Sequence, residues 1–96
     1  MAQVHLFRDA NFLGGSITRT ESDKDLRNDG FNDVVSSVIV VSGTFTLYMD
    51  PDFKGDSLTV CKTGGPNSDG RYPTPQSLAG RNDRVTSLKK NSNTPV

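Results

Sequence analysis

The residues whose side chains are best suited to binding or catalysis lie in a six-residue pattern that occurs twice, at positions 32–37 and 82–87. Both copies run amide, carboxylate, any residue, apolar residue, hydroxyl and serine, and each follows a glycine-containing loop. These side chains supply hydrogen-bonding oxygens, but they also favour turns and strand ends. A single copy would therefore be explained by turn chemistry. The second copy, in the same order, indicates that the chain is a tandem repeat of two related units.

Catalytic chemistry has few candidates in this sequence. His5 is the sole histidine and falls within an expected strand, where a structural role is the simpler explanation. Cys61 would need a basic partner to act as a nucleophile, so we interpret it as an inert strand thiol. As the only cysteine, it also excludes an intramolecular disulfide and a cysteine zinc site. One histidine gives no convincing Ser–His–Asp arrangement, and we predict that the chain is not an enzyme.

Two further motifs are weak. Residues 50–55 imitate the start of an EF-hand calcium loop, but the fifth position is Lys54 and the twelfth is Cys61 in place of glutamate. Because no helices are expected on either side, a hairpin turn is the better interpretation. The adjacent Lys89 and Lys90 are interpreted as a solvated strand end and not as a phosphate site.

Composition limits the fold to a single small domain. The chain has 96 residues, of which 32% are hydrophobic and none is tryptophan, so the core is modest. Its 11 basic and 11 acidic residues balance, which gives no electrostatic reason to expect nucleic acid or a membrane as a partner. All but one of the acidic residues are aspartate, a turn-forming type that argues against long helices.

Features that the sequence lacks lead to expectations about cellular location and oligomeric state. The first residues show no basic segment followed by an apolar one, so no signal peptide is visible and we expect an intracellular, cytoplasmic protein. The longest nearly apolar run, residues 34–41, is too short to span a bilayer. No heptads or obvious apolar stripe require a dimer, so we expect a monomer, and the sequence identifies no protein partner.

Short strands and hairpins must position the repeated polar pattern. The motif aromatic-x4-Phe-x-Gly precedes each copy, at positions 7–14 and 48–55, and predicts a folded hairpin whose turn is covered by an aromatic ring. The gap between the aromatic and polar motifs is longer in the second unit by about nine residues. The polar segment 62–70, which has no apolar residue, accounts for this difference as a loop insertion.

Alternating apolar residues predict the strands, and turn signals separate them. Strands are expected at 4–7, 16–19, 35–41, 45–48, 57–61 and 85–88. The 35–41 strand is rich in β-branched residues and is expected to be buried on both faces. One helical turn at most is expected at 22–26, with Leu26 as an anchor in the core, and Tyr72 is expected to fold back onto the sheets. We therefore predict an all-β fold, a two-sheet antiparallel β-sandwich.

The two motifs, in duplicate and in this order, resemble those of the βγ-crystallin superfamily. The stretch 25–37 is especially similar to the single-domain calcium-binding members, above all the urochordate and invertebrate type. The resemblance covers about residues 3–89 apart from the insertion. It implies a single domain over residues 1–90, built of two intertwined Greek-key motifs at about 3–42 and about 43–90. The loop insertion lies at 62–70, and residues 91–96 form a flexible tail.

The resemblance also implies two calcium sites, each built from both units so that the ion clamps the halves together. The first site would comprise the Arg8 carbonyl, the Ser36 hydroxyl, the Asp83 carboxylate and the Arg84 carbonyl. The second would comprise the Met49 carbonyl, the Thr86 hydroxyl, the Asp33 carboxylate and the Val34 carbonyl. Such a set, completed by water, suits a hard cation that prefers about six to eight oxygen ligands.

Two expectations follow from this implied ligand set. Each site has one carboxylate, and Arg8 and Arg84 add positive charge near the first, so we expect weak micromolar to sub-millimolar affinity and a tighter second site. The final serines of the two patterns, Ser37 and Ser87, would hydrogen-bond the folded hairpins and be structural.

Calcium binding that stabilises the fold is therefore the main functional hypothesis, and two alternatives remain open. One is a structural, lens-type crystallin that is stable and soluble and in which calcium binding is incidental. The other is a partner-binding or inhibitor module that uses the polar 62–70 loop as its contact surface.

Overall fold

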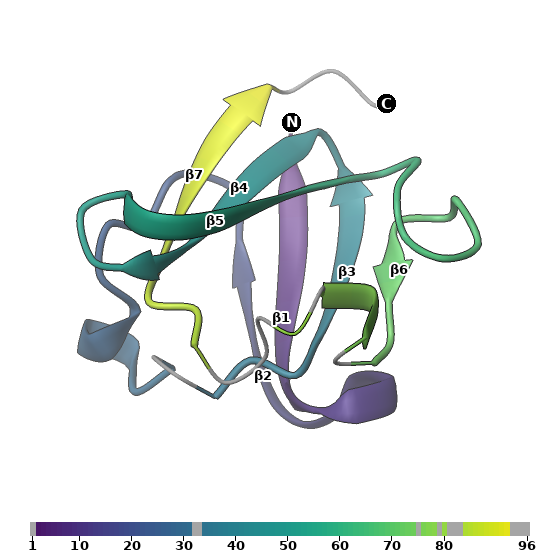
Figure 1. Ribbon diagram of the computed structural model, residues 1–96, viewed down its shortest axis with the longest axis horizontal. Coiled ribbons are helices and arrows are strands. Elements are labelled where there is room, and N and C mark those ends of the chain that lie inside the picture. The colour runs from purple at the N-terminus through teal and green to yellow at the C-terminus, as the bar shows by residue number, and fades with distance from the viewer. Residues whose placement is uncertain (1, 32–33, 75, 79, 81–83, 93–96) are drawn as a thin grey trace.

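Two antiparallel sheets pack face to face in the computed structural model, which describes residues 2–31, 34–74, 76–78, 80 and 84–92 (Figure 1). One sheet has the strand order β2-β1-β3-β6, and the other has the order β5-β4-β7. The elements in chain order are β1 (Gln3–Asp9), the 3-10 helix η1 (Ala10–Phe12), β2 (Leu13–Arg19), η2 (Leu26–Asp29), β3 (Ser37–Ser42), β4 (Thr44–Asp50), β5 (Lys54–Cys61), β6 (Arg71–Tyr72), η3 (Gln76–Leu78) and β7 (Ser87–Ser92). The prediction of an all-β, two-sheet sandwich is confirmed.

The two halves of the chain exchange a segment, which interlocks them. β6 belongs to the second half but lies beside β3 in the first-half sheet, with Tyr72 opposite Val38 (Figure 1). In return, Asp23 of the first half forms an antiparallel bridge with Leu88 in β7. Backbone hydrogen bonds of 2.9 Å run in both directions across that bridge. Each sheet therefore contains a contribution from the other half, which is the expected intertwined Greek-key arrangement.

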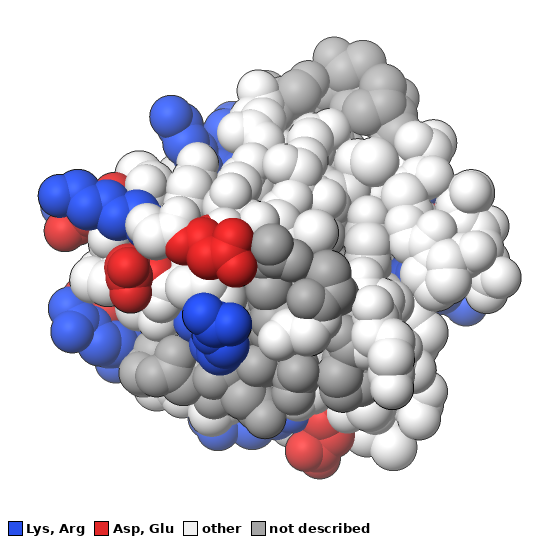
Figure 2. Space-filling model, viewed as in Figure 1, with Lys and Arg blue, Asp and Glu red and all other residues white. Residues whose placement is uncertain are grey.

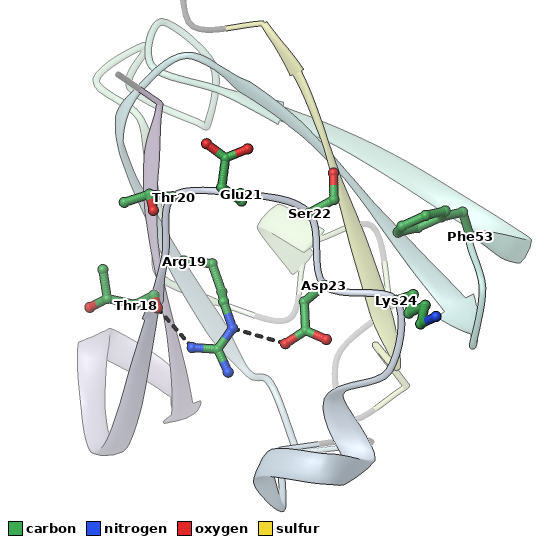
Figure 3. Close-up of a pocket in the computed structure, with 8 residues that line it drawn as sticks. All are labelled: Thr18, Arg19, Thr20, Glu21, Ser22, Asp23, Lys24 and Phe53. Atoms are coloured by element: carbon green, nitrogen blue, oxygen red, sulfur yellow. Dashed lines mark hydrogen bonds and ion pairs between the residues drawn. The ribbon is translucent and has the colours of Figure 1, made fainter.

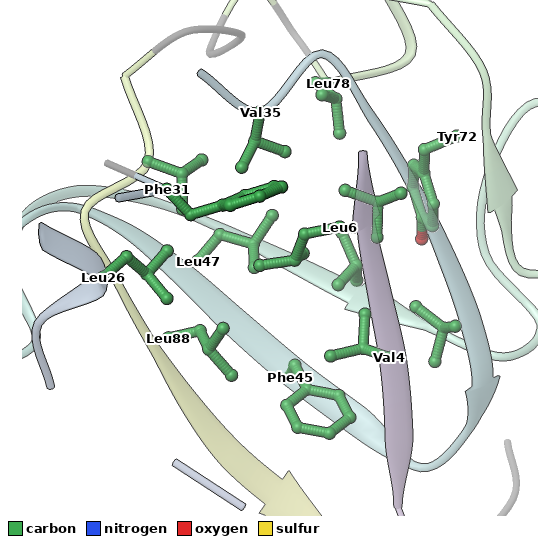
Figure 4. Packing of buried hydrophobic residues seen from close by; sticks show 14 of the residues in the cluster. Val4, Leu6, Leu26, Phe31, Val35, Phe45, Leu47, Tyr72, Leu78 and Leu88 are labelled. Atoms are coloured by element: carbon green, nitrogen blue, oxygen red, sulfur yellow. The ribbon is translucent and has the colours of Figure 1, made fainter. Parts of the chain in front are cut away.

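The core lies between the sheets and is filled by the inward-facing residues of the central strands (Figure 4). Val4 and Leu6 in β1, and Phe45 and Leu47 in β4, are each no more than 1% exposed. Leu26, the predicted anchor of the polar segment after β2, is fully buried among them. Burial of each such side chain contributes about 1.5–3 kcal/mol.

Both hairpins fold as predicted, with an aromatic pair over each turn. The Phe7 and Phe12 rings meet edge to face with centroids 5.6 Å apart, and the Tyr48 and Phe53 rings are tilted at 5.9 Å. Gly14 closes the first turn with a φ of 76°. A Cβ at this position would lie 2.6 Å from a neighbouring carboxylate oxygen. The left-handed backbone conformation favours glycine, and a side chain here would also have to displace the Asp9 carboxylate.

β3 differs from its predicted form in two ways. It begins two residues later than predicted, because its pairing with β1 starts where Ser37 faces Phe7. Its burial is also less complete than predicted, since Val38 and Val40 lie in the core and Ser37 is fully buried but Val41 is 40% exposed. A run of β-branched residues shows that a segment suits a strand, but the same residues are also accommodated on an outer face.

The strands after the hairpin turns are longer than predicted. β2 begins at Leu13 and β5 at Lys54, each three residues earlier than the alternating pattern indicates. Their ladders resume beyond an irregularity in pairing, where Leu13 faces Asp9 and Lys54 faces Asp50. Glycine and polar residues near the turns obscured this continuation in the sequence.

β7 is displaced toward the C-terminus relative to its prediction at 85–88. It begins at Ser87 and ends at Ser92, because its pairing with β4 runs from Tyr48 to Thr44. Residues 93–96 lie outside the described part of the chain.

The connecting segments largely follow expectation. The single helical turn occurs at η2, four residues later than predicted, and Asp25 caps it by accepting a hydrogen bond of 3.0 Å from the Arg27 N–H. That Arg27 side chain also pairs with Asp25 at 2.8 Å, which lowers the pKa of this carboxyl. The 62–70 insertion is a loop between β5 and β6, closed by a 2.9 Å hydrogen bond from the Gly70 N–H to the Gly64 carbonyl.

Tyr72 folds back onto the core as predicted, and burial raises the pKa of its phenol. Its oxygen accepts a hydrogen bond of 3.2 Å from the Cys61 N–H. Because burial raises the pKa only in the folded state, the contribution of Tyr72 to the free energy of unfolding is fully present below the unfolded pKa of about 10. It is lost as the pH rises above that value and through the folded pKa. We expect Tyr72→Phe to lower the free energy of unfolding by about 1 kcal/mol at neutral pH.

The difference between wild type and Tyr72→Phe should shrink as the pH passes about 10, because only the wild type loses this contribution. Urea unfolding at a series of pH values measures this difference. A difference that stays constant with pH would contradict the assignment.

Candidate metal centre

The two strands that carry a predicted carbonyl ligand are each irregular at that residue. The ladder between β1 and β2 passes over Arg8, and the ladder between β4 and β5 passes over Met49. In each case one residue, Arg8 or Met49, lies opposite two residues of the partner strand, so the β-bulge itself is on β2 or β5. Arg8 and Met49 thus occupy equivalent places in the two sheets.

The predicted hydroxyl ligands lie beside these irregularities. The Ser36 N–H donates to the Phe7 carbonyl at 2.9 Å, and the Thr86 N–H donates to the Tyr48 carbonyl at 2.8 Å. Phe7 and Tyr48 directly precede Arg8 and Met49. The structure therefore brings each hydroxyl residue next to the carbonyl residue predicted for the same site, once in each half.

The last serine of each polar pattern has the structural role predicted for it. The Ser37 hydroxyl donates to the Asp9 carbonyl at 2.6 Å and accepts from the Phe12 N–H at 3.0 Å. Ser87 makes the same two bonds to the second hairpin, at 2.6 and 3.1 Å. Both serines are fully buried and tie the folded turns to the sheets.

The remaining predicted ligands are placed less completely. Val34 is partly buried against the core, and Arg84 is exposed. The Thr86 hydroxyl donates to the Arg84 carbonyl at 3.4 Å. This hydrogen bond links a ligand predicted for the second site, Thr86, to one predicted for the first, Arg84. Asp33 and Asp83 lie outside the described residues, so the crossing of the two halves at the sites stays a prediction.

The described donors fit a hard cation. They comprise four backbone carbonyls and two hydroxyls, the oxygen ligands that calcium accepts. Among residues 2–31, 34–74, 76–78, 80 and 84–92, no cluster of three or more His, Cys, Asp or Glu side chains is present. The carboxylate part of each site thus depends on Asp33 and Asp83.

Sequence reasoning missed where the Arg8 side chain goes. It treated the guanidinium only as unfavourable charge near the first site. In the structure, Arg8 Nη2 donates to the Gly30 carbonyl at 3.2 Å, and Cζ lies 4.5 Å from the centre of the Phe31 ring. The signal was present, since Gly30 and Phe31 directly precede the first polar pattern, but the contact spans 22 residues.

A separate surface pocket of about 490 Å³ lies where the chain leaves β2 (Figure 3). The side chains of Arg19 and Asp23 point toward one another across it and form an ion pair of 2.9 Å (Figure 3). None of the predicted calcium ligands lines it. Its lining residues are Thr18, Arg19, Thr20, Glu21, Ser22, Asp23, Lys24 and Phe53.

Charge is unevenly distributed on the face drawn in Figure 2. Positive and negative side chains are interspersed toward η2 and the β4–β5 hairpin, whereas the side over β6 and the 62–70 loop is mostly uncharged. In the described part of the chain, no helix has the length and apolar character needed to cross a bilayer.

Comparison with known proteins agrees with this geometry. The family model described as Beta/Gamma crystallin matches residues 3–90. A curated beta/gamma-crystallin from Ciona intestinalis is 38% identical over 90 residues, which cover 94% of this chain and 99% of the relative. A solved beta gamma crystallin from the same organism is 37% identical with a TM-score of 0.81, over 93% of this chain and 99% of that one.

A solved βγ-crystallin from an archaeon has the same fold at lower identity. It is 24% identical, with a TM-score of 0.79 over 94% of this chain and 98% of that one. At this identity the likeness speaks for the fold alone. The family model and the Ciona intestinalis relative both extend over nearly the whole chain, and the chain therefore belongs to the beta/gamma-crystallin family.

Proposed function

We propose that this βγ-crystallin domain binds two calcium ions and that the ions stabilise its fold. The first would be held by Arg8, Ser36, Asp83 and Arg84, and the second by Met49, Thr86, Asp33 and Val34. Arginine, methionine and valine would contribute backbone carbonyls only. Calcium supplies charge neutralisation and oxygen coordination, and no catalytic step is proposed.

The observation that carries this proposal is that a residue opposite a β-bulge and a hydroxyl residue lie together in both halves. In both halves the residue opposite the bulge is the predicted carbonyl ligand. In both halves a backbone hydrogen bond shorter than 3 Å holds the predicted hydroxyl ligand beside it. Turn and strand chemistry explains serine and threonine in such places, but it does not require both features to coincide twice.

Stabilisation follows from the position of the ligands in the chain. Each proposed site takes residues from both halves, so the unfolded chain cannot present them together. An ion that binds only the folded state raises the free energy of unfolding by mass action. The exchange of β6 and the Asp23 bridge already interlocks the halves, and the ions would add a second kind of connection between them.

The test is a calorimetric calcium titration of chelator-treated protein. We expect two binding events in the weak micromolar to sub-millimolar range, with the first site the weaker because of Arg8 and Arg84. A single event, retained in Asp83→Asn and lost in Asp33→Asn, would show that only the second site functions. The absence of binding heat at several temperatures and calcium concentrations would contradict the proposal.

The rival hypothesis is a structural crystallin in which calcium binding is incidental. It predicts that calcium binds without raising stability, so thermal melts with and without calcium distinguish the two. A separate hypothesis is that the 62–70 loop contacts a partner. Replacement of this loop by a short turn should then abolish capture of the partner.

A further inference from the structure

The Arg8 side chain reaches from its place in β1, opposite the bulge of β2, to the segment that leads into the first polar pattern. Its Nη2 atom donates to the Gly30 carbonyl at 3.2 Å, and its guanidinium lies over the Phe31 ring at 4.5 Å. The Phe31 ring is only 4% exposed, so it is held in the core. Cation–aromatic contact and the hydrogen bond together fix two consecutive residues of this segment relative to β1.

From Phe31 a chain of backbone hydrogen bonds continues to the second proposed site. The Phe31 N–H donates to the Leu26 carbonyl at 3.0 Å, and the Leu26 N–H donates to the Thr86 carbonyl at 2.7 Å. Leu26 is fully buried and Thr86 is 5% exposed. Contiguous contacts between buried groups are the physical means by which a displacement at one site biases another.

The two halves are not equivalent at this point. The residue that corresponds to Arg8 in the second half is Met49, which is 8% exposed and packs in the core. The residue that corresponds to Phe31 by sequence is Arg81, which lies outside the described residues. The first half has a cationic residue in the strand and an aromatic residue before the polar pattern, whereas the second half has an apolar residue and a cationic residue at these two positions. The contact of Arg8 with Phe31 is therefore a specific feature of the first half.

We propose that Arg8 is a positioning residue that couples the two calcium sites. Its carbonyl belongs to the first site, and its guanidinium holds the segment that leads into Asp33 and that contacts Thr86 through Leu26. The inference rests on the proposed function. Binding of an ion to the first site fixes the backbone of Arg8 and favours the arrangement that the second site needs, and by linkage the second ion favours the first equally.

The coupling is measured by a thermodynamic cycle of calorimetric titrations. Asp33→Asn silences the second site, and its first-site dissociation constant is compared with that of the wild type, in which the tighter second site is already filled. We expect the filled second site to tighten the first by about fivefold or more, within the usual range of such couplings. In Arg8→Met the corresponding ratio should fall to about one.

Arg84→Met is the matched control for charge. It removes the same positive charge beside the first site, but Arg84 has no described contact with Gly30 or Phe31. Both substitutions should tighten the first site, whereas only Arg8→Met should abolish the coupling. Equal coupling in the wild type and Arg8→Met would overturn the proposal.

A second measurement needs no calcium. Hydrogen exchange at the Phe31 and Leu26 amides, the two donors of the connecting chain, should be faster in calcium-free Arg8→Met than in wild type or Arg84→Met. Unchanged exchange would overturn the positioning role even if the protein binds calcium. If the wild type binds two ions independently, only the proposed coupling is overturned. If it binds no ion, the proposed function is overturned as well.

Discussion

Saturating calcium should raise the free energy of unfolding by roughly 5 kcal/mol. An ion at a hundred times its dissociation constant contributes about 2.7 kcal/mol per site when it binds the folded state only, and two sites are proposed. For a domain of this size, each kcal/mol raises the melting temperature by roughly 4–8 °C. Calorimetric melts of chelator-treated protein, with and without calcium, should therefore differ by more than about 15 °C.

Substitutions at the two carboxylates divide this effect between the sites. Asp33→Asn and Asp83→Asn should each remove about half of the calcium-dependent increase, and the double variant should remove nearly all of it. Both changes preserve side-chain size. A second measurement in the absence of calcium separates lost binding from a defective fold.

Asp69→Asn is the matched control for the loss of one negative charge. Asp69 lies in the exposed 62–70 loop, where its Oδ1 atom accepts a hydrogen bond of 3.1 Å from the Arg71 N–H. The amide oxygen of asparagine can accept the same bond. The calcium response should be unchanged in this variant, and a response that survives in the Asp33 and Asp83 double variant would refute the ligand assignment.

The local features of the fold could be predicted from the sequence because they depend on short segments. The spacing of Phe7, Phe12 and Gly14 indicated a folded hairpin, since left-handed residues and an aromatic cover occur together in such turns. The hydrogen bonds of Ser37 to that hairpin followed from the family resemblance, and the structure contains them.

Strand boundaries could not be predicted with the same accuracy, because apolar patterning reports burial rather than pairing. Val35 and Val85 are both almost fully buried, yet both precede the strands to which they were assigned. Their side chains close the end of the core while their backbones pass outside the ladders. Conversely, Val41 lies within β3 but is exposed, at the point where the pairing of β3 with β1 shifts register.

The ligand residues of the candidate site were predicted from the resemblance and stay predictions, whereas the surroundings of the site could not be predicted. The duplicated pattern named the hydroxyl and carboxylate positions through resemblance alone. The contact of Arg8 with Phe31 and the bond from Leu26 to Thr86 join residues far apart in the chain. Neither contact has a local sequence signal, because only the interlocked sheets bring these segments together.

Adjacent serines in the first polar pattern should respond to substitution in opposite ways. Ser37→Ala should lower the free energy of unfolding by about 2–3 kcal/mol with or without calcium, because it leaves the Asp9 carbonyl and the Phe12 N–H without their buried partner. Ser36→Ala should cost less than about 1 kcal/mol without calcium. It should, however, remove the part of the calcium-dependent stabilisation that belongs to the first site.

The second half of the chain provides the same comparison independently. Ser87→Ala should resemble Ser37→Ala, since Ser87 makes the equivalent bonds to the Asp50 carbonyl and the Phe53 N–H. Thr86→Val keeps the shape of the side chain and removes only the hydroxyl, so it should weaken the second site. Chemical denaturation in chelator and in calcium measures both effects. If Ser37→Ala lost calcium response while Ser36→Ala lost only stability, the division between ligand and structural serine would be reversed.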